Sequence, residues 1–264
     1  FAPRYGWLKK GFDAALKNPN IFKEEDAVIE LGVGKNMIKS IRSWCLAFKI
    51  LSTEADKIVP TELGLKLFGS EDGWDPYIED DASLWLLHWQ LFIPPFEAVS
   101  WPLAFNYCNL RTFDVRELAK IIYNAGQKYP RIDRISPKTY QRDASCLIRM
   151  YLTPEEKDFE IESQFCQLGL MYRSVGMDQV SFNIGPKTTL PALICAAACF
   201  SYIMSYVPSG QKIVSLQRLV FGINSPGVAF KLPETEVGRY LDIARREVGG
   251  FDLVDSMGNM QVHL

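Results

Sequence analysis

The chain has 264 residues, 48% of them hydrophobic, and a formal net charge of −2. This composition is typical of a globular protein with ample material for a core. The longest apolar run, residues 190–200, is too short to span a bilayer, and the first residues lack the apolar stretch of a signal peptide. The sequence therefore excludes a membrane-spanning class.

The six cysteines lie mostly inside apolar segments and never in a CxxC arrangement. This spacing predicts reduced core cysteines rather than a disulfide framework or a zinc site, and hence a cytoplasmic protein.

The small net charge hides a segregation of charge along the chain. Residues 1–52 carry nine basic and five acidic side chains, and residues 110–151 carry nine and four. Between them, residues 53–109 carry two basic and ten acidic side chains. Two basic modules separated by an acidic connector are therefore expected, which the overall charge does not reveal.

The first module shows three helical periods and then a hairpin. Residues 6–18 and 23–32 predict two helices, and residues 35–48 a third. In the third helix, the apolar positions Met37, Ile41, Trp44 and Phe48 share one face, and Lys35, Lys39 and Arg42 lie opposite. We call these three residues the first basic stripe. Residues 49–64 then predict a β-hairpin, so the order is that of a winged helix-turn-helix.

The same order recurs in the second module. Residues 113–129 predict an amphipathic helix, and residues 135–152 predict a second one with Ser136 as N-cap and Pro137 at its first position. Tyr140, Ala144, Leu147 and Tyr151 form its expected core face. The opposite face carries what we call the second basic stripe, composed of Lys138, Arg142, Ser145 and Arg149. A hairpin is expected over residues 168–185.

The last part of the chain predicts a weaker third copy. Residues 188–207 are apolar all round and predict a buried central helix. A helix over residues 231–250 and a hairpin over residues 251–264 follow. We therefore predict a mainly α fold with small β-hairpins, built from tandem winged helix-turn-helix-like units around a buried central helix. The expected domains are residues 1–109, 110–187 and 188–264.

The sequence lacks the characteristic motifs of several enzyme classes. The sequence has two histidines, and it contains no HExxH, GxSxG, P-loop or strand-associated GxGxxG pattern. His88 lies among Trp and Leu residues, so we expect a buried core histidine rather than an acid–base catalyst.

The two basic stripes are the strongest evidence in the sequence for a function, namely DNA binding. Cationic side chains on a helix bind the phosphates of DNA, and the first residues of a helix in the major groove reach the base edges. Asn36 suits adenine and Arg142 suits guanine. The alternative is a solvated basic face that packs on the most acidic part of the connector, residues 71–81. The candidate DNA-binding residues of the stripes are Lys35, Asn36, Lys39, Arg42, Lys138, Thr139, Arg142 and Arg149.

The N-terminal segment adds a further candidate surface. Arg4, Lys9 and Lys10 alternate with Tyr5 and Trp7, and such a mixture suits single strands, whose bases stack on aromatic rings. The alternative is that the two aromatic side chains anchor the first helix.

The acidic connector is the only candidate for metal-dependent chemistry. Nuclease sites hold Mg²⁺ or Mn²⁺ between converging carboxylates, which Asp75, Glu79 and Asp80 would supply. The alternative is a solvated loop, since the spacing matches no metal signature. The catalytic and metal-binding residues are therefore not assigned by any motif, and without nicking no cofactor is expected.

Blocks along the whole chain resemble one known family. They include "RYGWLKKGFDAAL", "LGVGKNMIKSIRSW", "DASCLIRMY" and "FKLPETEVGRYL". The chain resembles the SspB-like DNA-nicking subunits of bacterial single-strand DNA phosphorothioation systems, a family formerly described as of unknown function. The resemblance implies DNA binding, opening of one strand for sulfur insertion, and a role in anti-phage defence. It also implies partners, namely a cysteine desulfurase, an ATPase and a sulfur-transfer enzyme.

The leading hypothesis is therefore a DNA nickase. A non-catalytic DNA-binding adaptor and a scaffold that binds sister subunits through its winged helices are the alternatives, and a homodimer is an open option. No membrane partner is expected.

Overall fold

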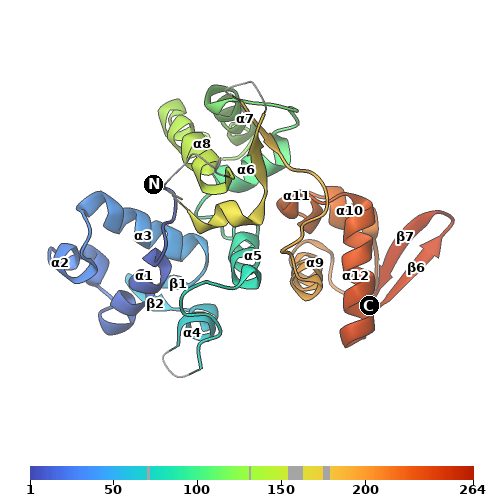
Figure 1. Cartoon of the computed structure of the whole chain (residues 1–264), viewed down its shortest axis with the longest axis horizontal. Coiled ribbons are helices and arrows are strands. Elements are labelled where there is room, and N and C mark those ends of the chain that lie inside the picture. Colours follow the sequence, from blue (N-terminus) through green and yellow to red (C-terminus); the bar gives the residue numbers. More distant parts are fainter. Residues whose placement is uncertain (70–71, 131, 154–162, 175–178) are drawn as a thin grey trace.

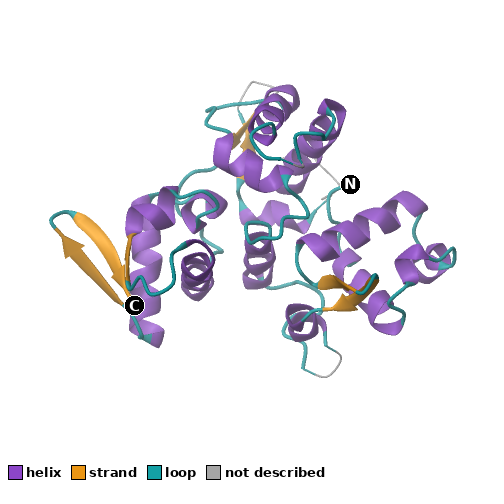
Figure 2. Cartoon of the chain, turned by 180° about the vertical axis from the view of Figure 1, so that it is seen from behind, coloured by secondary structure: helices purple, strands orange, loops and turns teal. Residues whose placement is uncertain are grey.

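The computed structural model describes residues 1–69, 72–130, 132–153, 163–174 and 179–264. Helices dominate, and the strands form small antiparallel hairpins and one three-stranded sheet (Figure 2). The predicted fold class, mainly α with small β elements, is confirmed.

The first part of the chain has the predicted element order. Helices α1 (Trp7–Lys17), α2 (Ala27–Leu31) and α3 (Lys35–Ala47) precede the hairpin of β1 (Leu51–Glu54) and β2 (Lys57–Pro60), with the short 3₁₀ helix η1 (Ile21–Lys23) between α1 and α2. They form the blue part of Figure 1. The chain turns tightly between the strands through Ala55 and Asp56, which both have positive φ.

The acidic connector is more structured than the sequence indicates. It forms helices α4 (Glu62–Phe68), α5 (Asp81–Gln90) and α6 (Ser100–Tyr107). The second module follows with α7 (Val115–Gly126), α8 (Pro137–Tyr151), the 3₁₀ helix η2 (Gln164–Leu168), β3 (Met171–Arg173) and β4 (Val180–Phe182). The turn of the β3–β4 hairpin, residues 175–178, lies outside the described residues.

The C-terminal part consists of α9 (Ala192–Tyr206), β5 (Ile213–Ser215), α10 (Leu216–Phe221), α11 (Pro226–Phe230), α12 (Glu234–Val248), β6 (Asp252–Ser256) and β7 (Asn259–His263). The sheet order is β5-β7-β6, so the predicted terminal hairpin gains a third strand. This hairpin extends away from the rest of the molecule (Figure 1). Its tight turn has positive φ at both Met257 and Gly258.

The prediction of residues 188–207 as a helix buried on all sides is wrong. Helix α9 leaves Leu193 43% exposed and Met204 81% exposed. The helix at the centre is α5, where Trp85 and His88 are fully buried (Figure 1). An apolar run shows that a helix lacks a polar face, but it does not show how many neighbours cover that helix.

His88 joins three parts of the core. Its Nε2 donates to the carbonyl of Ala229 in α11 at 2.8 Å, so Nδ1 accepts from the hydroxyl of Tyr151 in α8 at 2.7 Å. Burial lowers the pKa of His88 to about 4. The expectation of a core histidine is confirmed, and one continuous cluster of buried side chains extends through all three predicted domains. The domain boundaries themselves stay a prediction.

The six cysteines, all within the described part of the chain, are buried and none forms a disulfide. In the described ranges, no helix has the length and apolar character needed to cross a membrane.

Candidate nucleic-acid interface

Helix α8 is fixed by its first turn and its buried face. The hydroxyl of Ser136 accepts from the backbone N–H of Thr139 at 3.3 Å, and Pro137 occupies the first helical position, as predicted. Tyr140, Ala144, Leu147 and Tyr151 are all fully buried, which confirms the predicted core face.

Helix α7 holds α8 closely. A side-chain carbon on Gly126 would lie 2.5 Å from the hydroxyl of Tyr140, so only glycine permits this approach. The same hydroxyl donates to the carbonyl of Ile132 at 3.0 Å. Because this packing fixes the rotation of α8 about its axis, Lys138, Arg142 and Arg149 of the second basic stripe are exposed.

Helix α3 is also oriented by the packing of its buried face. Ile41, Trp44 and Phe48 are buried, and Met37 packs against the core while partly buried. The indole of Trp44 lies edge-on to Trp101 of α6, with ring centroids 5.0 Å apart. The predicted core face is confirmed, and Lys39 and Ser43 on the opposite side are exposed.

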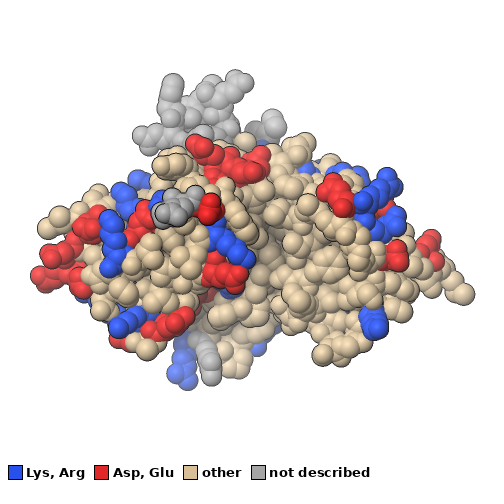
Figure 3. Space-filling view, turned by 90° about the horizontal axis from the view of Figure 1, so that it is seen from below, with Lys and Arg blue, Asp and Glu red and all other residues tan. Residues whose placement is uncertain are grey.

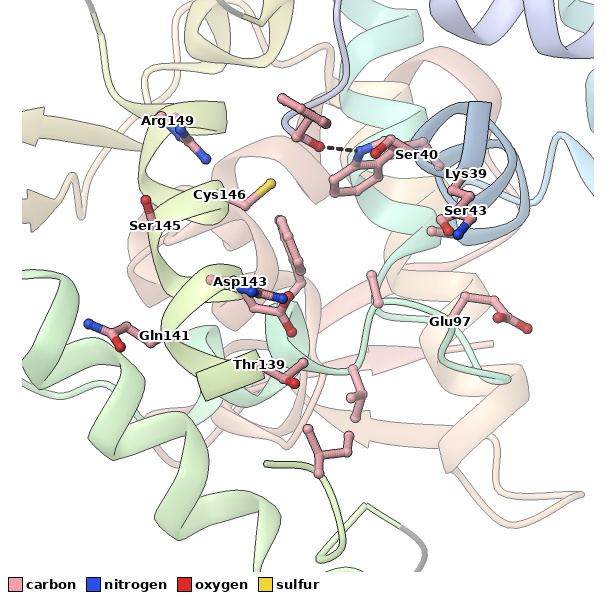
Figure 4. A pocket seen from close by; sticks show the side chains of 18 of the residues that line it. Lys39, Ser40, Ser43, Glu97, Thr139, Gln141, Asp143, Ser145, Cys146 and Arg149 are labelled. Atoms are coloured by element: carbon pink, nitrogen blue, oxygen red, sulfur yellow. Dashed lines mark hydrogen bonds between the residues drawn. The ribbon is translucent and has the colours of Figure 1, made fainter. Parts of the chain in front are cut away.

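The two basic helices face one another across a single groove of about 1120 Å³, which we call the α3–α8 groove. Figure 4 shows Lys39, Ser40 and Ser43 on one side and Asp143, Cys146 and Arg149 on the other. The cationic residues that line it are Lys39, Lys138, Arg142 and Arg149, and its uncharged polar residues include Asn36, Ser40, Ser43, Thr139, Gln141 and Ser145.

The groove is electropositive because few acids oppose its cations. Glu97 and Asp143 are the only acidic residues among its described lining. Within the described ranges, Lys39, Lys138 and Arg142 form no ion pair with a carboxylate. Unpaired cations next to hydroxyl and amide donors are the chemistry that contacts phosphates.

Asp143 was not singled out by the sequence. Its Oδ2 accepts from the hydroxyl of Ser100, the first residue of α6, at 2.6 Å. Burial raises the pKa of the Asp143 carboxyl, and the hydrogen bond from Ser100 opposes that rise. The one feature of the sequence that could have indicated Asp143 is its position directly after Arg142, as an acid next to a basic helix face.

Some of the predicted DNA contacts lie elsewhere. Lys35 is exposed but does not line the groove. Arg42 is half-buried and lies near Asp56 of the hairpin, whose pKa is lowered mainly by a hydrogen bond from Lys23 and to a smaller degree by Arg42. Of the first basic stripe, only Lys39 therefore faces the second.

The N-terminal candidates form a separate surface. Lys9 and Lys10 line a second hollow of about 360 Å³, but Lys9 is paired with Asp13. Arg4 lies 5.7 Å from the ring centroid of Trp7, which is buried and anchors α1. Tyr5 is 60% exposed, so only one of the two aromatic side chains is an anchor.

The acidic candidates have roles in local structure. Asp75 accepts from the backbone N–H groups of Glu79 at 2.9 Å and Asp80 at 3.0 Å. Although burial acts to raise the pKa of Asp75, these hydrogen bonds hold it below its ordinary value. Asp80 is the N-cap of α5 and accepts from Ala82 at 2.8 Å. Among the described residues, no group of three or more His, Cys, Asp or Glu side chains is arranged to hold a metal ion.

Comparison with known proteins places the chain in a family. Residues 1–264 match the family described as a protein of unknown function, DUF4007, and the chain belongs to this family. It is also similar to SspB over its whole length. One SspB crystal structure shares 31% sequence identity with a TM-score of 0.89, and a magnesium ion-bound SspB structure shares 30% with the same score. Each alignment covers 100% of this chain and 81% of the SspB chain. No curated protein matches the sequence.

Proposed function

We propose that this protein binds DNA in the α3–α8 groove as part of a bacterial DNA phosphorothioation system. The observation that carries the proposal is the convergence of Lys39, from one module, with Lys138, Arg142 and Arg149, from another, on one groove. The similarity to the SspB structures supports this biological setting, which the sequence resemblance also implies. The cysteine desulfurase, ATPase and sulfur-transfer subunits of such a system are the proposed partners.

Each part of the groove has a role in this proposal. The cations bind phosphates and release condensed counterions, which makes binding depend on salt. The hydroxyl and amide groups of α3 and α8 fix the position of the DNA backbone. Arg142, in the first half of α8, reaches a base edge if the helix enters a major groove, as the winged helix-turn-helix prediction requires. Thr139 is one turn closer to the helix start and contacts the backbone.

We further propose that the protein nicks one strand, and the family resemblance supports this step. One of the similar SspB structures is described as magnesium-bound. The carboxylates of Asp75, Glu79 and Asp80 do not fit a metal site as they stand, since backbone groups occupy Asp75 and Asp80. No hydrolytic step is therefore assigned to them.

The alternative is a DNA-binding adaptor that positions the sulfur-transfer enzymes without cutting. Supercoiled plasmid incubated with the purified protein, with and without Mg²⁺ or Mn²⁺, separates the two functions. Relaxed circles that require the metal support a nickase. If none form at any protein concentration while salt-dependent binding persists, the protein is an adaptor.

The acidic candidates are tested in the same assay. If they hold a catalytic metal, changing Asp75 and Asp80 to Asn and Glu79 to Gln abolishes nicking and spares binding. Undiminished nicking by this triple variant would place the catalytic carboxylates elsewhere.

A further inference from the structure

Two adjacent residues of opposite charge line the α3–α8 groove. Arg142 and Asp143 are neighbours on α8, and both contribute to the lining. In Figure 4, Asp143 points from α8 toward the space between the two helices. Phosphates bound by the surrounding cations would be repelled by this carboxylate, so a different chemical group must lie next to Asp143.

The carboxylate of Asp143 is held in place with one acceptor left available. Ser100 is 1% exposed and donates to Oδ2, which restrains the carboxylate. Oδ1 accepts no hydrogen bond from another described residue. A carboxylate that accepts one hydrogen bond and has a second oxygen open favours a ligand that carries an N–H donor.

In the groove, the DNA group with such a donor is a base edge. In the major groove, a G·C pair presents the acceptors N7 and O6 of guanine beside the N4 amino donor of cytosine. Arginine donates to the first two atoms, and aspartate accepts from the third. An A·T pair presents an acceptor, a donor, a second acceptor and then the thymine methyl group. This order does not match an arginine followed by an aspartate.

We propose that Asp143 is a specificity-determining residue, and that Arg142 and Asp143 together recognise one G·C pair in the major groove. Arg142 contacts the guanine and Asp143 accepts from the cytosine amino group. Ser100 is a positioning residue, because it acts on the base only through Asp143. This inference depends on the proposed DNA binding in the same groove.

The test is a binding competition over short duplexes that differ by G·C, C·G, A·T or T·A at each position in turn. It compares the wild-type protein with Asp143→Asn and with Glu97→Gln, after thermal unfolding confirms that all three are folded. Glu97 is the matched control, since it lines the same groove and carries the same charge, but points away from α8 in Figure 4.

The wild-type protein is expected to prefer G·C at one position. Asp143→Asn should reduce that preference about tenfold or more, the loss expected for one hydrogen bond to a charged group. Glu97→Gln should keep the preference and only tighten binding to all duplexes. Ser100→Ala provides a second measurement, with a smaller loss of the same preference.

Two results would overturn the inference and leave DNA binding intact. One is salt-dependent binding by the wild-type protein with no G·C preference at any position. The other is an equal change for all duplexes in Asp143→Asn and Glu97→Gln, which would show that Asp143 contributes charge alone. Absence of any DNA binding by the wild-type protein would instead contradict the proposed function, and this inference with it.

Discussion

Helix α12 carries three arginines and the α3–α8 groove is lined by four cations, but the two sets differ in what they contact. On α12, Arg239 pairs with Glu236, and Arg245 and Arg246 both pair with Asp242. In the groove, Lys39, Lys138 and Arg142 have no carboxylate partner within the described ranges. Paired arginines must break an existing contact before they bind phosphate, whereas unpaired cations exchange only water and counterions.

Both signs of charge also occur together on the face of the molecule seen in Figure 3. The face seen in Figure 3 mixes red and blue side chains at both ends of the molecule and is largely free of charged side chains in between. Mixed signs give a solvated surface without a strong field. The number of basic residues in a helix is therefore a poor guide to DNA binding, and their pairing is a better one.

The largest expected effect comes from removing the groove cations together. Changing Lys39, Lys138 and Arg142 to Ala should reduce the magnitude of the negative slope of log K against log salt by about 3, one phosphate contact for each cation. Fluorescence anisotropy with a labelled duplex over a range of salt concentrations measures this slope.

The matched control is the α12 variant in which Arg239, Arg245 and Arg246 become Ala. It should keep nearly the wild-type slope. An equal loss in both variants would remove the distinction between the two surfaces.

Stability should not distinguish the two helices, because both are held by buried leucines. Leu147 of α8 and Leu241 of α12 are fully buried. Each Leu→Ala change should lower the free energy of unfolding by about 2–5 kcal/mol. Urea denaturation of the two variants measures this, and a loss below about 1 kcal/mol at Leu147 would show that α8 is not anchored as described.

Within the groove, the position of an arginine along α8 should decide whether it reads the base sequence or only binds phosphates. Arg142→Ala should cost about 1–3 kcal/mol on the preferred duplex and relax its sequence preference. Arg149→Ala, farther from the helix start, should weaken all duplexes alike. The competition over a duplex library measures both, and identical profiles would make α8 a phosphate clamp only.

The smallest effect on DNA binding is expected from breaking the ion pairs of the α12 arginines with Asp242. Asp242→Asn removes the partner that Arg245 and Arg246 share and leaves Arg245 its ion pair with Asp252, so nonspecific DNA binding at low salt should rise only modestly. The two ion pairs are partly exposed and lie within one helix, so the change in stability should stay within about 1 kcal/mol. A decrease in binding would contradict the role assigned to pairing.

The sequence predicted the local structure of the interface well. The 3.6-residue period separated the buried faces of α3 and α8 from their basic faces, and Ser136 and Pro137 marked the start of α8 correctly. These features depend on residues that are close to one another in the sequence, so the periodic pattern of the sequence predicts them.

What the sequence did not reveal depends on residues far apart in the chain. That Lys39 and Arg142 share one groove follows from the packing of Trp44 against Trp101 and of α7 against α8. That Asp143 is an oriented acceptor follows from Ser100, 43 positions earlier. The structure of the acidic connector was missed for a similar reason, since Asp75 and Asp80 are used to cap backbone rather than to meet solvent.

The location of the DNA is the central claim, and site-specific photo-crosslinking tests it most directly. The cross-linking residue p-benzoylphenylalanine would replace Ser43 of α3, Ser145 of α8 or, as the control, the exposed Glu247 of α12. Irradiation with a labelled duplex should give covalent adducts from Ser43 and Ser145 and few or none from Glu247. Adducts from the α12 position alone would show that the DNA lies outside the α3–α8 groove.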